Sequence, residues 1–156
     1  METAYIKTLL GIVKIIGDDE GVSVISISDE GDSSLTIPFV LQEAVSQLNE
    51  YFEGKRILFT FKLNPSGTDF QQTVWAALLE IHFGQTMSYL ELSKKIGDVK
   101  AIRAVASANG RNPLWIVVPC HRVIGTDGSL TGYAGGLWRK KWLLELENPS
   151  NQQSFF

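Results

Sequence analysis

The sequence has 156 residues, of which 44% are hydrophobic and 20% charged, a composition typical of a folded chain rather than a disordered one. No apolar run is long enough to span a membrane, and Met1–Tyr5 lacks the basic and apolar segments of a secretory signal. We therefore expect no membrane partner and an intracellular protein, cytoplasmic or, in a eukaryote, nuclear. The chain has one cysteine and two histidines, which excludes an internal disulfide and predicts that no metal is bound.

The net charge of −3 argues weakly against nucleic acid as a partner, because most proteins that bind nucleic acid are basic. The charge is unevenly distributed, however. Residues 1–66 contain five Lys and Arg against ten Asp and Glu, a charge of −5, whereas residues 67–156 contain nine against seven, a charge of +2. Charge alone favours ordinary surface variation, but any polyanion is expected to meet the second half.

The first half of the chain predicts strands and one helix. The β-branched and apolar residues of 5–16 precede a turn at 17–21, and Val22–Ser28 alternates apolar and polar residues as a half-buried strand does. A helical pattern opens at Pro38 and ends at Gly54, and Ile57–Phe61 is predicted as a further strand. No catalytic constellation is visible here.

A boundary at 64–67 precedes a mostly helical half. Thr68 and Ser88 each begin a capping-box pattern, which predicts one helix with Phe70, Val74, Leu78 and Ile81 buried and a second helix that ends at Gly97. Asp98 is expected to cap a third helix, so that the second and third helices form a helix-turn-helix. The run 115–118 predicts a buried strand, and 137–147 a final helix. We expect an α/β fold with domains at 1–66 and 67–156.

Cys120 is the candidate nucleophile. A lone cysteine is usually a small buried hydrophobe, but this one lies between Pro119 and His121, where a stiff backbone can aim the sulfur. His121 and Arg122 supply an imidazole and a positive charge, which can lower the pKa of a thiol. A base next to a thiol is a standard way to generate the reactive thiolate, directly or through a water.

Several linked motifs around Cys120 resemble the O6-alkylguanine-DNA alkyltransferases. The similarity extends over about 70–147, and the N-terminal half shares only the strand–helix outline of a ribonuclease-H-like domain. The motifs that carry it, in order, are Arg103–Asn109, Asn112-Pro113, Pro119-Cys120-His121-Arg122-Val123-Ile124-Gly125, Thr131-Gly132-Tyr133-Ala134-Gly135-Gly136, Lys140 and Trp142–Leu144.

The resemblance implies irreversible, single-turnover transfer of an alkyl group from O6-alkylguanine, and also from O4-alkylthymine, in DNA to Cys120. It implies that His121 acts as a base through a water and that Glu147 orients it. Asn112 would brace the active-site turn, Tyr133 would donate to guanine N3, and Lys140 would support the developing charge. No cofactor is implied, and the expected protein is a monomer that acts on double-stranded alkylated DNA.

The resemblance also implies how the substrate is held. Arg103, with Ala104 and Ser107 on the same small-residue helix, would contact DNA and fill the gap left by an extruded base, and Tyr89 would crowd the target phosphate. Backbone groups near Val123 and Ala134 would contact the guanine, and Trp115 is expected to wall the pocket. This chain lacks the residues for the N-terminal zinc site of some members.

Two alternatives remain open from the residues. Cys120 and His121 would also suit a cysteine hydrolase, which turns over, although no oxyanion loop is evident. The helix-turn-helix would also suit a binding module with an inert cysteine. Transfer of one permanent methyl group to Cys120 separates the alkyltransferase from both alternatives.

Overall fold

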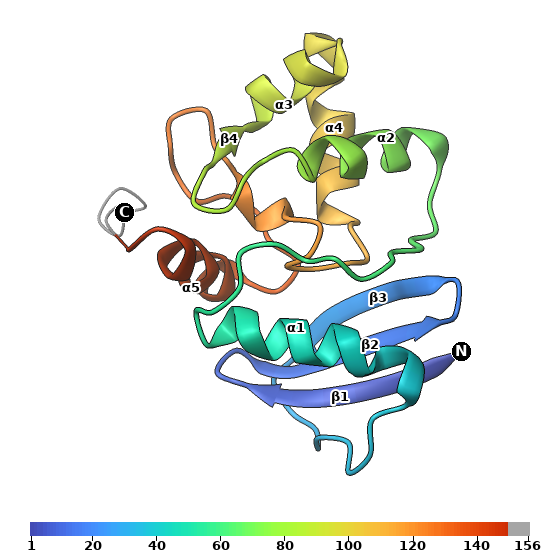
Figure 1. Cartoon of the computed structure of the whole chain (residues 1–156). Helices are drawn as coiled ribbons and strands as arrows, with labels where there is room; N and C mark the ends of the chain where they lie inside the picture. The colour runs from blue at the N-terminus through green and yellow to red at the C-terminus, as the bar shows by residue number, and fades with distance from the viewer. Residues whose placement is uncertain (150–156) are drawn as a thin grey trace. The chain divides into compact units, whose positions relative to one another are not determined.

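The computed structural model describes residues 1–149, and residues 150–156, the end of the predicted second domain, lie outside the described part (Figure 1). The chain divides into two compact units. The first consists of Met1–Ser66 together with Pro113–Trp115, and the second of Gly67–Asn112 together with the chain from Ile116 onward. A short piece of the C-terminal half thus belongs to the N-terminal unit.

The first unit contains an antiparallel sheet in the order β1-β2-β3. Its strands are β1 (Glu2–Thr8), β2 (Gly11–Asp18) and β3 (Gly21–Ser28), so the predicted strand at 22–28 is confirmed. Their alternating apolar residues, among them Ile15 and Ile25, pair across the sheet and are fully buried. The register shifts at Gly17, where an added Cβ would lie 2.8 Å from the carbonyl oxygen of Gly21, so this close approach requires glycine.

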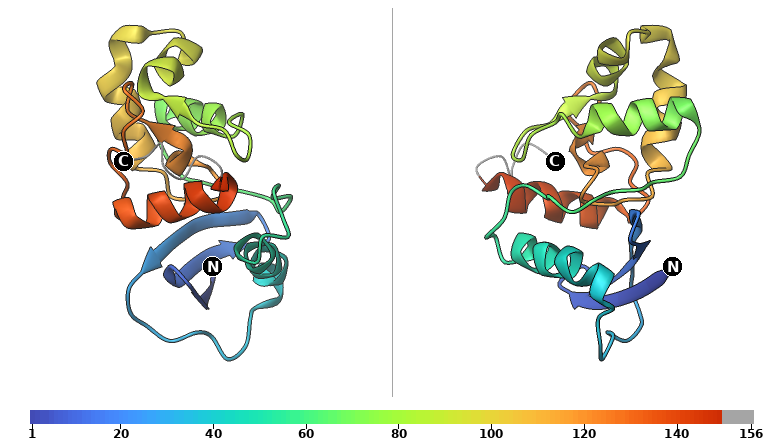
Figure 2. Two further views of the ribbon diagram at one scale, coloured as in Figure 1. Left: turned by 90° about the vertical axis from the view of Figure 1, so that its left-hand side faces the viewer. Right: turned by 45° about the vertical axis from the view of Figure 1, so that its right-hand side comes forward.

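Helix α1 (Gln42–Phe52), preceded by a short 3-10 turn η1 (Phe39–Leu41), lies beside the sheet in both orientations of the ribbon (Figures 1 and 2). Its apolar stripe is buried and includes Val45, Leu48 and Tyr51. The helix confirms the pattern predicted from Pro38 to Gly54.

The strand predicted at Ile57–Phe61 is wrong. This segment follows the helix instead of pairing with a strand, because the side chain of Gln47 on α1 bonds both the backbone N–H of Thr60 (2.9 Å) and its hydroxyl (2.7 Å). The ring of Phe59 also lies 5.4 Å from that of Tyr51. A side chain of α1 therefore occupies the backbone N–H of Thr60, a group that a ladder would use.

The strand predicted at Trp115–Val118 is also wrong. Leu114 forms an isolated parallel bridge with Ile25, held by hydrogen bonds from Ile25 N–H to Pro113 O and from Trp115 N–H to Ile25 O. The chain then turns at 115–117, where Ile116 has a φ of 75°. A positive φ is strained for a β-branched residue and ends the extended run.

The second unit is mostly helical. Helices α2, α3 and α4 pack against one another, and the short strands β4 and β5 form a parallel pair. The bounds are α2 (Asp69–Leu78), β4 (Met87–Ser88), α3 (Tyr89–Ile96), the 3-10 turn η2 (Val99–Ala101), α4 (Ile102–Gly110), the 3-10 turn η3 (Cys120–Arg122), β5 (Val123–Ile124) and α5 (Leu137–Glu147).

The helix ends largely follow the sequence signals. Both capping boxes are present, at Thr68 and Ser88, and Gly97 ends α3 with a left-handed φ of 104°. Asp98 caps η2, which leads into α4, so α3 and α4 form the helix-turn-helix. Phe70 was expected to be buried but is 38% exposed, because it lies in the first turn of α2, before the buried part of the stripe begins at Val74.

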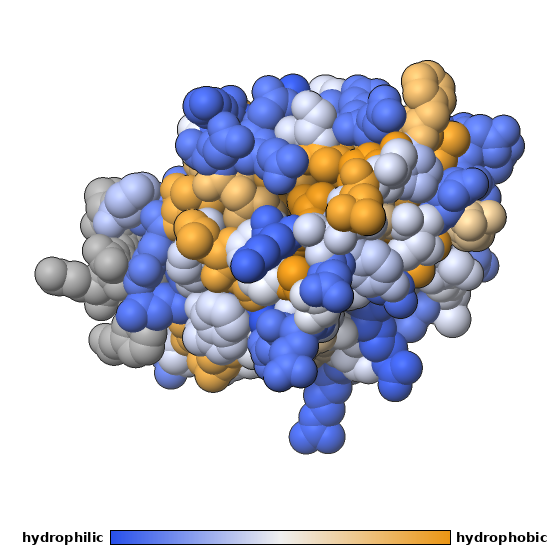
Figure 3. Space-filling model, turned by 90° about the horizontal axis from the view of Figure 1, so that it is seen from below, coloured by the Kyte–Doolittle hydropathy of each residue, from blue (hydrophilic) through white to orange (hydrophobic). Residues whose placement is uncertain are grey.

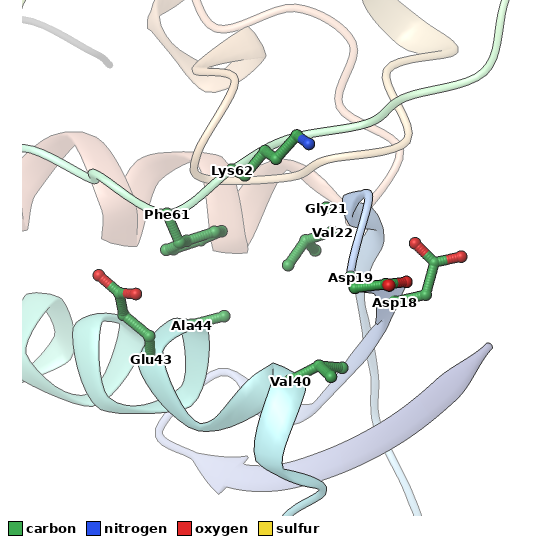
Figure 4. A pocket seen from close by; sticks show the side chains of 9 residues that line it. All are labelled: Asp18, Asp19, Gly21, Val22, Val40, Glu43, Ala44, Phe61 and Lys62. Atoms are coloured by element: carbon green, nitrogen blue, oxygen red, sulfur yellow. The ribbon is translucent and has the colours of Figure 1, made fainter.

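Two surface features belong to the first unit. The face seen from below shows apolar side chains interrupted by polar ones (Figure 3), and the exposed apolar residues of this unit include Leu35, Phe39, Ile57 and Leu58. A cavity of about 220 Å³ has an apolar floor with carboxylates near its edges (Figure 4). Its lining residues are Asp18, Asp19, Gly21, Val22, Val40, Glu43, Ala44, Phe61 and Lys62.

Among residues 1–149, no helix has the length and apolar character needed to cross a bilayer.

Candidate active site

Cys120 opens the turn η3 in the second unit, directly after the strained turn at Ile116. Cys120 is buried, with 5% of its surface exposed. Its backbone N–H donates to the carbonyl of Val118 at 2.8 Å, which tightens the chain around Pro119. The cysteine is therefore held by a compact turn rather than by the end of a strand.

Asn112 braces this turn from the end of the preceding helix. Its buried amide nitrogen donates to the carbonyl of Val118 at 2.7 Å. The same side chain interacts with the thiol of Cys120. Asn112 thus fixes both the backbone before the cysteine and the cysteine side chain.

The thiol of Cys120 is protonated at neutral pH. Burial raises its pKa from 9.0 to about 11, although a hydrogen bond from Asn112 and the charge of Lys140 act in the opposite direction. The expectation that His121 and Arg122 lower this pKa is wrong: the guanidinium of Arg122 binds a carboxylate elsewhere. The proton must therefore be removed as part of any reaction of this thiol.

His121 and Glu147 form a buried pair. Nε2 of His121 lies 2.7 Å from Oε2 of Glu147, and both side chains are almost completely inaccessible. Burial alone would raise the pKa of Glu147, but the contacts with His121 and Arg122 outweigh it and hold that pKa well below its usual range. Within the described part of the chain, no hydrogen-bond partner contacts Nδ1 of His121. The imidazole can therefore donate to Glu147 and still accept a proton.

Arg122 is the functional residue whose role the sequence did not reveal. Its Nε and Nη2 donate to the two carboxylate oxygens of Glu147 at 2.7 and 3.0 Å, and Nη1 donates to the carbonyl of Ile81 at 2.6 Å. The motif around Cys120 marks Arg122 only as a nearby charge. A buried carboxylate at the end of the final helix, which needs a partner, is the signal that could have found it.

Lys140 and Tyr133 both interact electrostatically with Cys120. Nζ of Lys140 donates to the carbonyls of Thr131 (2.7 Å) and Gly132 (3.2 Å), and burial lowers its pKa to about 8. Burial raises the pKa of Tyr133 well above 10, with a further contribution from Cys120, so its hydroxyl remains a donor at neutral pH. The segment 131–136 thus contains the donor Tyr133, and its carbonyls bind the buried cation of Lys140 on α5.

Three other predicted residues of the second unit lie on short elements. The hydroxyl of Tyr89, the first residue of α3, donates to Thr131 O at 3.4 Å, and its ring lies 5.9 Å from Nζ of Lys140. Val123 is buried on β5, paired with β4. Ala134 is exposed in a turn closed by a hydrogen bond from Gly136 N–H to Tyr133 O.

The residues expected to contact DNA share the exposed side of α4. Arg103, Ala104 and Ser107 are all exposed, whereas Val105 and Ala108 are buried. Trp115, by contrast, belongs to the first unit, where its N–H bonds Ile25. Its expected place in the pocket wall stays a prediction.

Among the described residues, no group of three or more His, Cys, Asp or Glu could hold a metal ion.

The fold and the site define a class of protein: a small α/β unit followed by a helical unit in which a helix-turn-helix accompanies a buried cysteine and a His–Glu pair. Residues 1–65 match the model of the 6-O-methylguanine DNA methyltransferase ribonuclease-like domain. Residues 69–149 match the model of the DNA binding domain of the same proteins.

Individual members of this family are also similar to this chain in sequence and in structure. A methylated-DNA–protein-cysteine methyltransferase of Methanosarcina acetivorans is 45% identical over 94% of this chain and 98% of its own. One from Mycobacterium tuberculosis is 56% identical over 70% of this chain and 67% of its own. The crystal structure of M. tuberculosis OGT in complex with DNA superposes with a TM-score of 0.86, at 42% identity, over 100% of both chains. The chain belongs to the 6-O-methylguanine DNA methyltransferase family.

Proposed function

We propose that this protein repairs DNA by moving an alkyl group from O6 of guanine to its own Cys120. The observation that supports this most directly is the buried thiol of Cys120, followed in the turn η3 by His121, whose imidazole lies 2.7 Å from Glu147, in the same unit as a helix-turn-helix. Family membership supplies the substrate. Because that substrate is DNA, we place the protein inside the cell, in the cytoplasm or a nucleus.

The transfer begins with the proton of Cys120. It passes to Nδ1 of His121, directly or through a water, while Nε2–H remains bonded to Glu147. The sulfur then attacks the alkyl carbon as the bond from that carbon to guanine O6 breaks, and the bonding electrons stay with the guanine. The products are a thioether on Cys120 and a guanine that regains a proton, so each chain reacts once.

The leaving guanine is a poor leaving group unless its charge is stabilised. The hydroxyl of Tyr133, which remains protonated, is suited to donate to guanine N3. Lys140 is tied to the carbonyls of the neighbouring segment and supports the developing charge. Backbone groups at Val123 and Ala134 hold the base edge, and Asn112 keeps the turn before Cys120 in place.

The helix-turn-helix delivers the base. A guanine inside a duplex hides its alkyl carbon, so the nucleotide must be turned out of the stack. Arg103 is a long cation flanked on the exposed side of α4 by the small residues Ala104 and Ser107, which allow close approach to a groove. Tyr89, at the start of α3, is placed to crowd the target phosphate.

Transfer stoichiometry tests this function. The protein is mixed with an excess of duplex containing O6-methylguanine, and the repaired base is counted over time. We expect a plateau at one methyl group per chain and no transfer by Cys120→Ser, because a hydroxyl is a far weaker nucleophile at neutral pH. Continued turnover would indicate a hydrolase, and unchanged DNA would indicate a binding module.

A further inference from the structure

The guanidinium of Arg122 is a fixed, buried cation. Its side chain is 8% exposed. It forms a two-pronged ion pair with Glu147, in the geometry that gives the strongest arginine–carboxylate contacts. Its remaining terminal nitrogen bonds the carbonyl of Ile81 after α2, so the last helix and that segment together set its position.

Glu147 therefore has two candidate counter-ions. Its Oε2 accepts from both Arg122 and His121. An arginine stays protonated throughout the pH range in which proteins fold. With a neutral imidazole the buried trio has no net charge, whereas a protonated imidazole would leave one buried positive charge uncompensated, which is costly.

We propose that Arg122 is a positioning residue that acts as the permanent counter-ion of Glu147 and thereby keeps His121 neutral. The imidazole then carries its proton on Nε2 and presents Nδ1 to the proton of Cys120. Without Arg122, the carboxylate would draw a second proton onto the imidazole and the base would be lost. The charge assignment rests on the geometry, and its catalytic consequence rests on the proposed alkyl transfer.

Other ionisable groups near this trio interact with one another and with Cys120 or Glu147, and they are common to all variants considered below. They are Cys120 on η3, Arg139 and Lys140 on α5, Tyr133 in the segment 131–136 and Tyr89 on α3. Because Arg122 contacts both carboxylate oxygens of Glu147, we expect its replacement to act on His121 through Glu147 and not through these other groups.

A pH–rate profile tests the catalytic consequence, with the free base O6-benzylguanine as substrate so that DNA binding does not enter. In Arg122→Gln, the acid limb should move up by about two pH units, from below pH 7 to above it, so the rate at pH 7 falls about tenfold and recovers at higher pH. Arg122→Lys keeps the charge and should keep the limb where it is. Lys141→Met removes a cation of α5 that pairs with Glu145 and should change nothing.

A uniform loss of rate in Arg122→Gln with an unmoved limb would overturn the proposal, because it would show that Arg122 only supports the fold. A shift in Lys141→Met equal to that in Arg122→Gln would also overturn it, because any nearby cation would then do.

Nitrogen NMR of the imidazoles tests the charge assignment without any alkyl transfer. The chain has two histidines, so His82→Gln leaves the signals of His121 alone. At pH 7 we expect a neutral ring protonated on Nε2, and in the added Arg122→Gln variant an imidazolium. An imidazolium in the parent overturns the proposal even if Arg122→Gln fails to fold. A neutral ring in a protein that transfers no alkyl group would instead contradict the proposed function.

Discussion

A thiol that attacks carbon must lose its proton, yet the surroundings of Cys120 favour the protonated form. Burial separates the sulfur from water and raises its pKa to about 11. Asn112 and Lys140 reduce this effect without cancelling it. The resting protein therefore holds an unreactive thiol that depends on His121 at the moment of reaction, which protects it from stray alkylating agents.

The first prediction concerns this thiol. In the free protein, alkylation by iodoacetamide and the ultraviolet absorbance of the thiolate should both rise toward a midpoint near pH 11. Because the folded pKa of about 11 lies above the ordinary thiol value of 9.0, the contribution of Cys120 to stability is fully present below about pH 9 and is lost as pH rises toward 11. Cys120→Ser should lack this loss. A midpoint near pH 7 would show that the site activates the thiol without substrate.

The second prediction concerns the base. His121→Gln should slow transfer to free O6-benzylguanine by about 100-fold at neutral pH, a typical contribution of a general base. Its rate should then climb in proportion to hydroxide concentration, because the thiol must ionise unaided, whereas the parent profile stays flatter. Rates from pH 7 to pH 9.5 decide this, and parallel profiles would mean that Cys120 is activated by another group.

The sequence identified the residues of this site better than their contacts. The family resemblance singled out Cys120, His121 and Glu147, and the structure brings the last two within hydrogen-bonding distance. The sequence did not reveal that Arg122 binds Glu147. Residues in a 3-10 turn project about 120° apart, yet His121 and Arg122 both reach Glu147, and only the position of the last helix shows that they share this carboxylate.

At the level of elements, local signals were reliable where side chain and backbone are close in sequence. The capping boxes and the Gly97 helix end were predicted because their hydrogen bonds span three or four residues. The two false strands, Ile57–Phe61 and Trp115–Val118, are apolar segments whose partners are distant. Their pairing groups are taken by Gln47 on α1 and by the turn at Ile116, and neither can be read from the segment itself.

The third prediction concerns the start of the helix-turn-helix. Oγ of Ser88 accepts from the N–H of Glu91 at 3.0 Å, and the carboxylate of Glu91 accepts from the N–H of Ser88 at 3.1 Å. Ser88→Ala should lower the free energy of unfolding by about 1 kcal/mol. Ser46→Ala, at an exposed position inside α1, is the control and should be nearly neutral. Denaturant midpoints measure both, and equal effects would refute a capping role.

The fourth prediction concerns α4. Arg103→Ala should slow repair of methylated duplex more than reaction with a free base, because only the duplex requires extrusion. Arg103→Lys keeps the charge for phosphate attraction but is expected to restore the duplex rate only in part, since a flexible ammonium fills the vacated space poorly. An equal loss on duplex and free base would assign Arg103 to folding or to the chemical step.

For the whole molecule, the charges match the division of labour between the units. Residues 1–66 carry −5, whereas residues 67–156, which include the helix-turn-helix, carry +2. The excess is small, so we expect DNA binding to weaken with salt along a shallow slope. The return of Pro113–Trp115 to the first unit could not be predicted, because it depends on a bridge between residues almost ninety positions apart, Ile25 and Leu114.

The central claim is that Cys120 keeps the alkyl group, and peptide mass spectrometry after reaction with O6-methylguanine duplex tests it most directly. The account predicts one added methyl group on the peptide that contains Cys120, stable to thiol reductants, with the DNA restored to guanine. Cys120→Ser, treated in the same way, should gain nothing. Restored guanine without a methyl group on Cys120, or a methyl group on any other residue, would contradict the account.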